Sequence, residues 1–163
     1  MGTRSTIAMK KPDGGLVATY CHWDGYPDHN GKILNENYQD DEKIQQLIGL
    51  GDISSLRPEI GEKHRFPADH EVCKTAAWRQ LYDSWTTAYH RDRGEPWDHV
   101  APQHFDDAKE WVESMSESWV EWAYLWNGQD WLVHKIRERG ESKGYPVFDF
   151  AEIAIEKDAE LAN

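Results

Sequence analysis

Residues 120–136, VEWAYLWNGQDWLVHKI, give the strongest indication of β structure in the chain. Two largely apolar runs flank Asn127 and Gly128, a dipeptide that favours a two-residue type I′ turn because both of its residues tolerate positive φ. The sequence therefore predicts an antiparallel hairpin with one largely aromatic face. The expected cross-strand pairs are Trp126 with Gln129, Tyr124 with Trp131, Trp122 with Val133 and, on the other face, Glu121 with His134.

The segment before this hairpin, residues 105–118, has the pattern of an amphipathic helix. Apolar side chains recur at steps of three and four residues, and we expect this stripe to cover the aromatic face of the hairpin. The stripe consists of Phe105, Ala108, Trp111, Val112 and Met115. Acidic side chains form a ridge opposite to it, which consists of Asp106, Glu110, Glu113 and Glu117.

The rest of the chain completes an α+β pattern. Residues 3–10 and 16–23 predict an N-terminal hairpin around the turn sequence KPDGG, and residues 57–67 predict a surface loop. Further helices are expected at 30–39, 43–50 and 69–82, and further strands at 85–90 and 146–155. We expect one α+β domain over 1–155, an antiparallel sheet with helices packed mainly on one face, and a frayed tail at 156–163.

Composition limits the classes of function. The 163 residues carry a formal net charge of −12, which disfavours direct binding to nucleic acid and favours partners with a basic surface. The two cysteines make no disulfide framework, no apolar run is long enough to cross a membrane, and the first residues lack the apolar core of a signal peptide. We therefore expect a cytoplasmic protein without a membrane partner.

Residues 19–31, TYCHWDGYPDHNG, hold an unusual density of reactive side chains directly after a predicted strand. Cys21, His22, Asp24 and His29 are zinc-ligand types, but their spacing matches no Cys/His pattern, so we expect no metal and no cofactor. Adjacent strand residues point to opposite faces, so Cys21 and His22 are not expected to form a nucleophile–base pair. Ser5 with His22 stays open as the alternative pair. The structural interpretation places Cys21 and Trp23 in the core.

Three arginines suit an anionic ligand. Arg4, Arg91 and Arg93 are scarce cations in an acidic chain, and a guanidinium matches phosphate or carboxylate. If residues 91–95 face the 19–27 segment, these arginines could hold a nucleotide-like anion. The groups that would join them are His22, Trp23, Asp24 and Tyr26. The structural alternative is that Arg91 and Arg93 pair with Asp24 and Glu95 and fix two loops.

Five separated motifs carry a family resemblance. They are RSTI (4–7), YCHWDGYP (20–27), LGDIS (50–54), AYHRDRGE (88–95) and WAYLWNGQDWLV (122–133). Together they resemble a family of short proteins encoded by bacteriophages and bacterial mobile elements, whose activity is unassigned. The resemblance implies a role inside a bacterial host, such as host takeover or counter-defence.

Two functional hypotheses follow. The first is a non-enzymatic phage-type protein that binds and inhibits a host factor through its acidic surface, with Asp106, Glu110, Glu113 and Glu117 as a mimic of nucleic-acid phosphates. The second is a small-molecule site that binds or hydrolyses a nucleotide-like ligand around Arg4, His22, Asp24 and Arg91. The sequence contains no nucleophile elbow and no phosphate loop, which favours the first.

Overall fold

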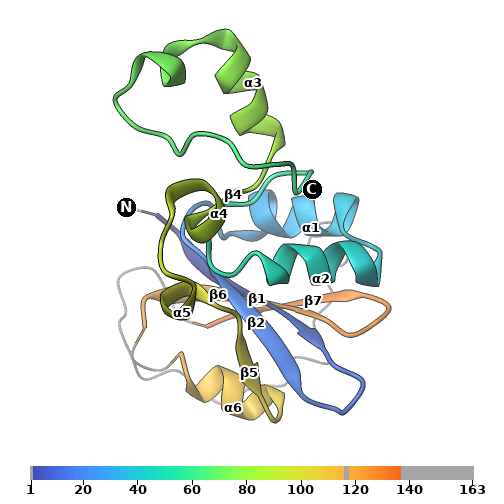
Figure 1. The fold of residues 1–163 in the computed structure, drawn as a ribbon. Coiled ribbons are helices and arrows are strands. Elements are labelled where there is room, and N and C mark those ends of the chain that lie inside the picture. Colours follow the sequence, from blue (N-terminus) through green and yellow to red (C-terminus); the bar gives the residue numbers. More distant parts are fainter. Residues whose placement is uncertain (1, 116–117, 137–163) are drawn as a thin grey trace.

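The computed structural model describes residues 2–115 and 118–136, and it confirms the α+β class (Figure 1). The strands are β1 (Arg4–Lys10), β2 (Leu16–Cys21), β3 (Ile53–Ser55), β4 (Thr87–Ala88), β5 (Gln103–Phe105), β6 (Val120–Trp126) and β7 (Trp131–Lys135). The helices are α1 (Lys32–Asn37), α2 (Asp41–Gly49), α3 (Ala76–Ser84), α4 (Tyr89–Arg93), α5 (Trp97–Val100) and α6 (Ala108–Glu113). A π-helical turn, η1 (Pro27–Gly31), precedes α1, and a 3₁₀ turn, η2 (Glu71–Lys74), precedes α3.

All seven described strands form one sheet, which is mostly antiparallel but includes parallel pairs. The strand order is β4-β3-β2-β1-β6-β7, with β5 paired to the first half of β2. β1 runs antiparallel to β2 but parallel to β6, and β2 runs parallel to β3. The parallel pairing of β2 with β3 follows from the crossover through α1 and α2, because a helical crossover returns the chain in the same direction. The apolar pattern of a strand does not encode this choice.

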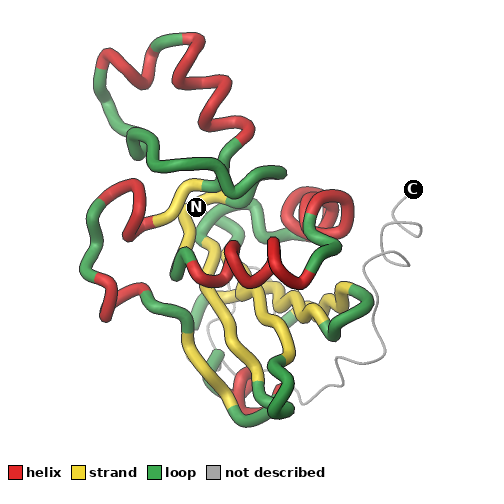
Figure 2. Tube along the Cα trace, turned by 45° about the vertical axis from the view of Figure 1, so that its right-hand side comes forward, coloured by secondary structure: helices red, strands yellow, loops and turns green. Residues whose placement is uncertain are grey.

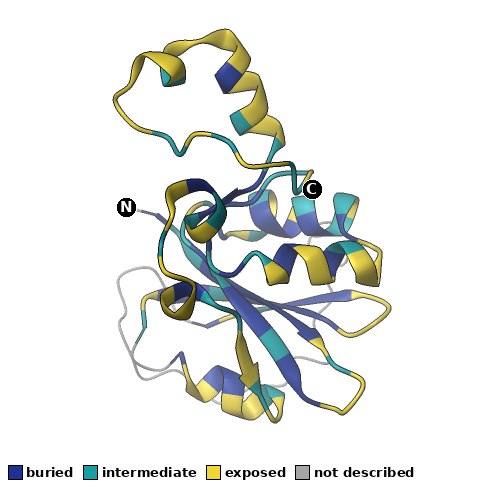
Figure 3. Cartoon of the chain, in the orientation of Figure 1, coloured by how far each residue is buried: buried dark blue, intermediate teal, exposed yellow. Residues whose placement is uncertain are grey.

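Helices cover both faces of the sheet, and the aromatic face of the 120–136 hairpin lies under α1 and α2 rather than under the 105–118 segment as expected. On one face α1 and α2 bury Leu34, Ile44 and Leu47 against Ile7 and its neighbours. On the other face α6 buries Trp111, Val112 and Met115 against Ala8, Leu16 and Ala18. Successive residues of β1 and β6 are therefore buried, as in strands between two layers (Figure 3).

The 120–136 hairpin forms as predicted, but its register is shifted. Trp126 lies opposite Trp131 and Tyr124 opposite Val133, so four residues form the loop instead of two. The Asn127 carboxamide oxygen accepts hydrogen bonds from the backbone N–H groups of Gln129 (2.9 Å) and Asp130 (2.7 Å). This side-chain turn replaces the type I′ turn, and only Gly128 has a positive φ there.

Polar caps shorten two predicted helices. The Asp107 carboxylate accepts from the Glu110 N–H at 2.9 Å and starts α6 at residue 108, while Phe105 joins β5 opposite Leu16. In the same way the Thr75 hydroxyl accepts from the Trp78 N–H and starts α3. The predicted strand at 85–90 is confined to β4, because the chain turns into α4 at Tyr89. Side-chain caps therefore set boundaries that apolar periodicity misses.

The segment that contains α3 stands apart from the sheet, at the opposite end of the molecule from α6 in both views (Figures 1 and 2). In α3 only Trp78 is buried, whereas Leu81 is 37% exposed. The apolar residues of this predicted helix therefore do not form a core face. The expected strand at 146–155 and the tail at 156–163 lie outside the described residues.

No helix within residues 2–115 and 118–136 combines the length and apolar character that a membrane crossing requires.

Candidate functional site

The 22–31 loop, which follows β2, is organised around one buried amide. Asn30 is fully buried, and its Nδ2 lies 3.4 Å from Ser5 Oγ, 3.3 Å from Cys21 Sγ and 3.4 Å from the Trp23 carbonyl. The Gly25 N–H donates to the Thr3 carbonyl at 2.8 Å, and a Cβ at Gly25 would lie only 2.7 Å from Ser5 Cβ. The loop is therefore fixed against the start of β1.

This arrangement engages the two candidate nucleophiles of the segment. Cys21 is fully buried, which raises the pKa of its thiol to about 11, and Ser5 faces it across the β1–β2 ladder. Ser5 lies beside Asn30 rather than His22, because His22 follows Cys21 on the opposite side of the strand. Among the described residues, no three His, Cys, Asp or Glu side chains gather closely enough to hold a metal ion.

Trp23 and Tyr26 are displayed by the loop. Trp23 is 41% exposed, which corrects the expectation that it lies in the core, and Tyr26 is similarly exposed. Asp24 adopts a left-handed conformation with φ of 56°, and its carboxylate accepts from the Tyr26 hydroxyl at 3.5 Å. Two aromatic rings and a carboxylate thus project from a loop whose backbone is held in place.

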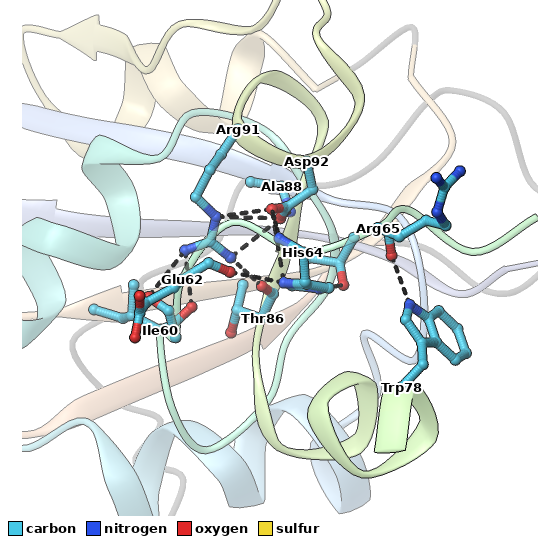
Figure 4. Close-up of polar contacts among 11 residues, drawn as sticks. Ile60, Glu62, His64, Arg65, Trp78, Thr86, Ala88, Arg91 and Asp92 are labelled. Atoms are coloured by element: carbon cyan, nitrogen blue, oxygen red, sulfur yellow. Dashed lines mark hydrogen bonds and ion pairs between the residues drawn. The ribbon is translucent and has the colours of Figure 1, made fainter. Parts of the chain in front are cut away.

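Arg91 is the centre of a structural network (Figure 4). Its guanidinium contacts both Asp92 carboxylate oxygens at 3.0–3.2 Å and also donates to the carbonyls of Ile60, Gly61 and Thr86. Asp92 in turn accepts from the backbone N–H groups of His64 (3.1 Å) and Ala88 (2.7 Å). These bonds join the 60–64 segment to the start of α4.

The three arginines predicted to converge are therefore separated by their partners. Arg93 pairs with Glu95 at 2.9 Å and lies over the rings of Phe66 and Tyr89. The structural alternative expected Arg91 and Arg93 to pair with Asp24 and Glu95. Of these pairs only Arg93 with Glu95 forms, and neither arginine pairs with Asp24. Arg91 has its guanidinium occupied by protein groups.

Arg4 is different. None of its guanidinium nitrogens has a hydrogen-bond or ion-pair partner among the described residues, and its Nε is buried. It lies near Tyr20 and His22, whose side chains share a hydrogen bond of 2.8 Å. Burial lowers the pKa of His22, and the Arg4 charge lowers it further, so both effects favour the neutral imidazole. Of the residues in the predicted anion site, Arg4 and His22 come together.

A cavity of about 150 Å³ lies between β2, β5 and the end of α6. Its walls include Tyr20, Gln103, Phe105, Trp111 and Ser114, and its one charged lining residue among those described is Asp52. Asp52 follows Gly51, whose φ of +80° ends α2 and turns the chain towards β3. One Asp52 carboxylate oxygen accepts from the Tyr20 N–H (3.1 Å) and the Thr19 hydroxyl (3.4 Å).

Sequence reasoning did not select Asp52. The signal was an acidic residue placed between a helix-ending glycine and a buried strand, within LGDIS. Burial raises the pKa of this carboxyl to about 6, although the hydrogen bonds from Tyr20 and Thr19 lower it in part. A carboxyl group with a raised pKa in a cavity is a candidate for a binding role.

The structure describes three residues of the predicted acidic ridge. Asp106, Glu110 and Glu113 are exposed, but Lys109 lies 4.0 Å from Glu113, and Asp107 is engaged as the cap of α6. Glu117, the fourth residue of the predicted ridge, lies outside the described residues. Glu110 and Glu113 belong to α6, the helix that also supplies Trp111 of the cavity wall.

No protein-family model, curated protein or solved structure matched the chain. The fold and the site define an α+β protein with a cavity that has an acidic wall. The functional proposals rest on this geometry.

Proposed function

We propose that the chain is a non-enzymatic binding protein that recognises a partner protein with a basic surface. The observation that carries this proposal is the acidic character of the cavity wall and of α6, the helix beside it. Asp52 is the only charged residue described in the wall of the cavity, and Glu110 and Glu113 are exposed on α6. Acidic groups of this kind attract cationic groups and repel anionic ones.

Two further features support binding over catalysis. The buried thiol of Cys21 is held in its protonated form at neutral pH, and the arginine network around Arg91 is saturated by protein groups. The net charge of −12 adds long-range attraction to a basic partner. The resemblance to phage-encoded proteins extends the proposal to a host factor in the bacterial cytoplasm, which the protein inhibits by occupying its basic surface.

The test is affinity capture from bacterial lysate with wild-type protein and a Glu110→Lys, Glu113→Lys double variant. We expect wild type to retain one basic protein in stoichiometric amount, and the double variant to lose it. Added salt should weaken the capture, because it screens exposed charges over roughly 8 Å at physiological ionic strength. Mass spectrometry identifies the retained protein.

A matched control changes the same charge elsewhere. Asp69→Lys with Glu71→Lys alters two exposed acids near η2, at the far end of the molecule from α6 (Figure 1). This control should retain the partner. Equal loss in both double variants, with both proteins folded by circular dichroism, would contradict recognition through the α6 face.

Arg4 supports a second candidate, the binding of a small phosphate or carboxylate ligand. Its guanidinium is unpaired within the described part of the chain and lies near the Tyr20–His22 pair. Arg4→Gln should then abolish the binding of inorganic phosphate or a nucleotide measured by calorimetry and leave partner capture intact. Phosphate binding that survives Arg4→Gln would remove this candidate.

A further inference from the structure

The cavity beside Asp52 combines features that suit an organic cation. A carboxylate provides the negative charge, and the rings of Tyr20, Phe105 and Trp111 provide apolar walls. Aromatic faces attract cations, and they also cover the methylene groups to which an ammonium or guanidinium is attached. The cavity volume of about 150 Å³ fits a small group rather than a folded segment.

The Asp52 carboxylate is only half used by the protein. Both hydrogen bonds from Thr19 and Tyr20 end on Oδ1, whereas Oδ2 accepts none within residues 2–115 and 118–136. Asp52 also forms no ion pair with a described lysine or arginine. Oδ2 is not fully buried, and Asp52 lines the cavity, so this oxygen is available to a ligand there.

The other polar groups of the wall fit the same ligand. The Ser114 hydroxyl donates to the Trp111 carbonyl and so turns its oxygen lone pairs outward as acceptors. Gln103 is exposed in β5, and its side-chain amide has no hydrogen bond among the described residues. A cation that bonds to Asp52 Oδ2 therefore finds further acceptors at the entrance.

We propose that this cavity binds a single organic cation, an alkylguanidinium or alkylammonium group, with Asp52 Oδ2 as its counter-ion. This inference rests on the proposed function, in which the cation is an arginine or lysine side chain of the partner protein. A free amine has the same chemistry and is the other source. Asp52 then determines which residue of a basic surface the protein selects.

The test uses n-butylguanidinium and n-butylammonium as probes, with neutral n-butylurea and anionic butyrate as controls. Amide chemical shifts of ¹⁵N-labelled protein report binding at Asp52, Gln103 and Ser114. We expect the two cations to bind and the two controls not to bind. Asp52→Asn keeps the size of the side chain and should lower the affinity for both cations by about 10- to 100-fold, the range of a charge-assisted hydrogen bond.

Two further variants keep the result interpretable. Asp69→Asn removes the same charge from an exposed position near η2, outside the cavity, and should leave the affinity unchanged. Gln103→Glu adds a carboxylate at the entrance and should tighten the cations even if Asp52→Asn fails to fold. Four results overturn the proposal: unaltered cation binding in a folded Asp52→Asn variant, unaltered cation binding in Gln103→Glu, equal binding of butylurea, or no binding of either cation.

A competition separates this inference from the proposed function and identifies the source of the cation. Butylguanidinium should displace the captured partner from wild type if the partner's side chain enters the cavity. Partner capture without any probe binding overturns the cavity site alone. Probe binding without any captured basic protein overturns the proposed function and assigns the cavity to a free amine.

Discussion

At the scale of single residues, the two cysteines differ in environment and should differ in reactivity. Cys21 is fully buried with a pKa raised to about 11, so about one thiol in 10,000 is ionised at pH 7, whereas Cys73 is partly exposed. We expect a disulfide reagent such as DTNB to titrate one thiol quickly and the second only on unfolding. Cys73→Ser should remove the fast phase. A fast phase that persists in this variant and disappears in Cys21→Ser would show that the 22–31 loop opens readily.

Asp52 gives the stability of the protein a defined pH dependence. Its folded-state pKa of about 6 lies above the ordinary value of 3.8, so ionisation of Asp52 opposes folding. Below pH 3.8 the carboxyl is protonated in both the folded and the unfolded protein, so it costs no stability. The destabilisation grows as the pH rises from 3.8 to about 6 and reaches its full value above about pH 6. Asp52→Asn should therefore gain about 1 kcal/mol over wild type between about pH 4 and pH 7, after allowance for partial exposure.

Urea unfolding of both proteins across this pH range measures that difference. Other titrating groups are common to the two proteins and cancel. Asp106→Asn is the control, because Asp106 is exposed and its replacement should leave the difference flat with pH. A gain that shrinks as the pH rises would mean that a cation, absent from the described contacts, stabilises the Asp52 carboxylate.

At the scale of elements, Arg91 joins the 60–64 segment to β4 and α4. The Asp92 side chain is fully buried, so removal of the guanidinium leaves a carboxylate without its counter-charge. Arg91→Ala should lower the free energy of unfolding by about 3–5 kcal/mol. Arg79→Ala is the control, because Arg79 faces Asp83 on the exposed side of α3 and should cost about 0–1 kcal/mol.

Denaturant unfolding followed by tryptophan fluorescence checks both values. A cost for Arg91→Ala no larger than that of Arg79→Ala would mean that the network contributes little to stability. In that case the AYHRDRGE motif would need an explanation outside folding. A large cost supports a structural origin for its first arginine, Arg91, and its aspartate, Asp92.

Elements also show where a local pattern fails. Alternation predicted the two hairpins correctly, because burial of one face leaves a period-two signal in the sequence. The predicted two-residue loop of the second hairpin was wrong, because the Asn127 side chain accepts hydrogen bonds from the backbone N–H groups of Gln129 and Asp130. The turn formed by this side chain replaces the type I′ turn and shifts the cross-strand pairs by two residues. A shift of two residues leaves each side chain on its predicted face of the sheet.

At the scale of the whole molecule, stability should be uneven. The 62–84 segment buries few apolar side chains and is held by contacts such as Trp78 Nε1 to the Arg65 carbonyl, whereas β1 is almost entirely buried between two layers (Figure 3). Amide hydrogens of α3 should exchange much faster than those of β1 and β6. Mass spectrometry of exchanged peptides measures this. Equal protection of α3 and β1 would indicate a partner, such as a second copy, on the exposed side of α3.

The sequence by itself determined the α+β class, the two hairpins, the helix α2 and the acidic character, because these depend on local periodicity, turn chemistry and composition. Only the tertiary structure decided that β1 runs parallel to β6, that helices cover both faces, and that Arg91 serves Asp92 rather than a ligand. It also placed Asp52 of LGDIS in one cavity with Phe105 and Trp111, more than fifty residues away. Local patterns report which side of an element is buried, whereas the partner of a buried face or charge depends on residues distant in the chain.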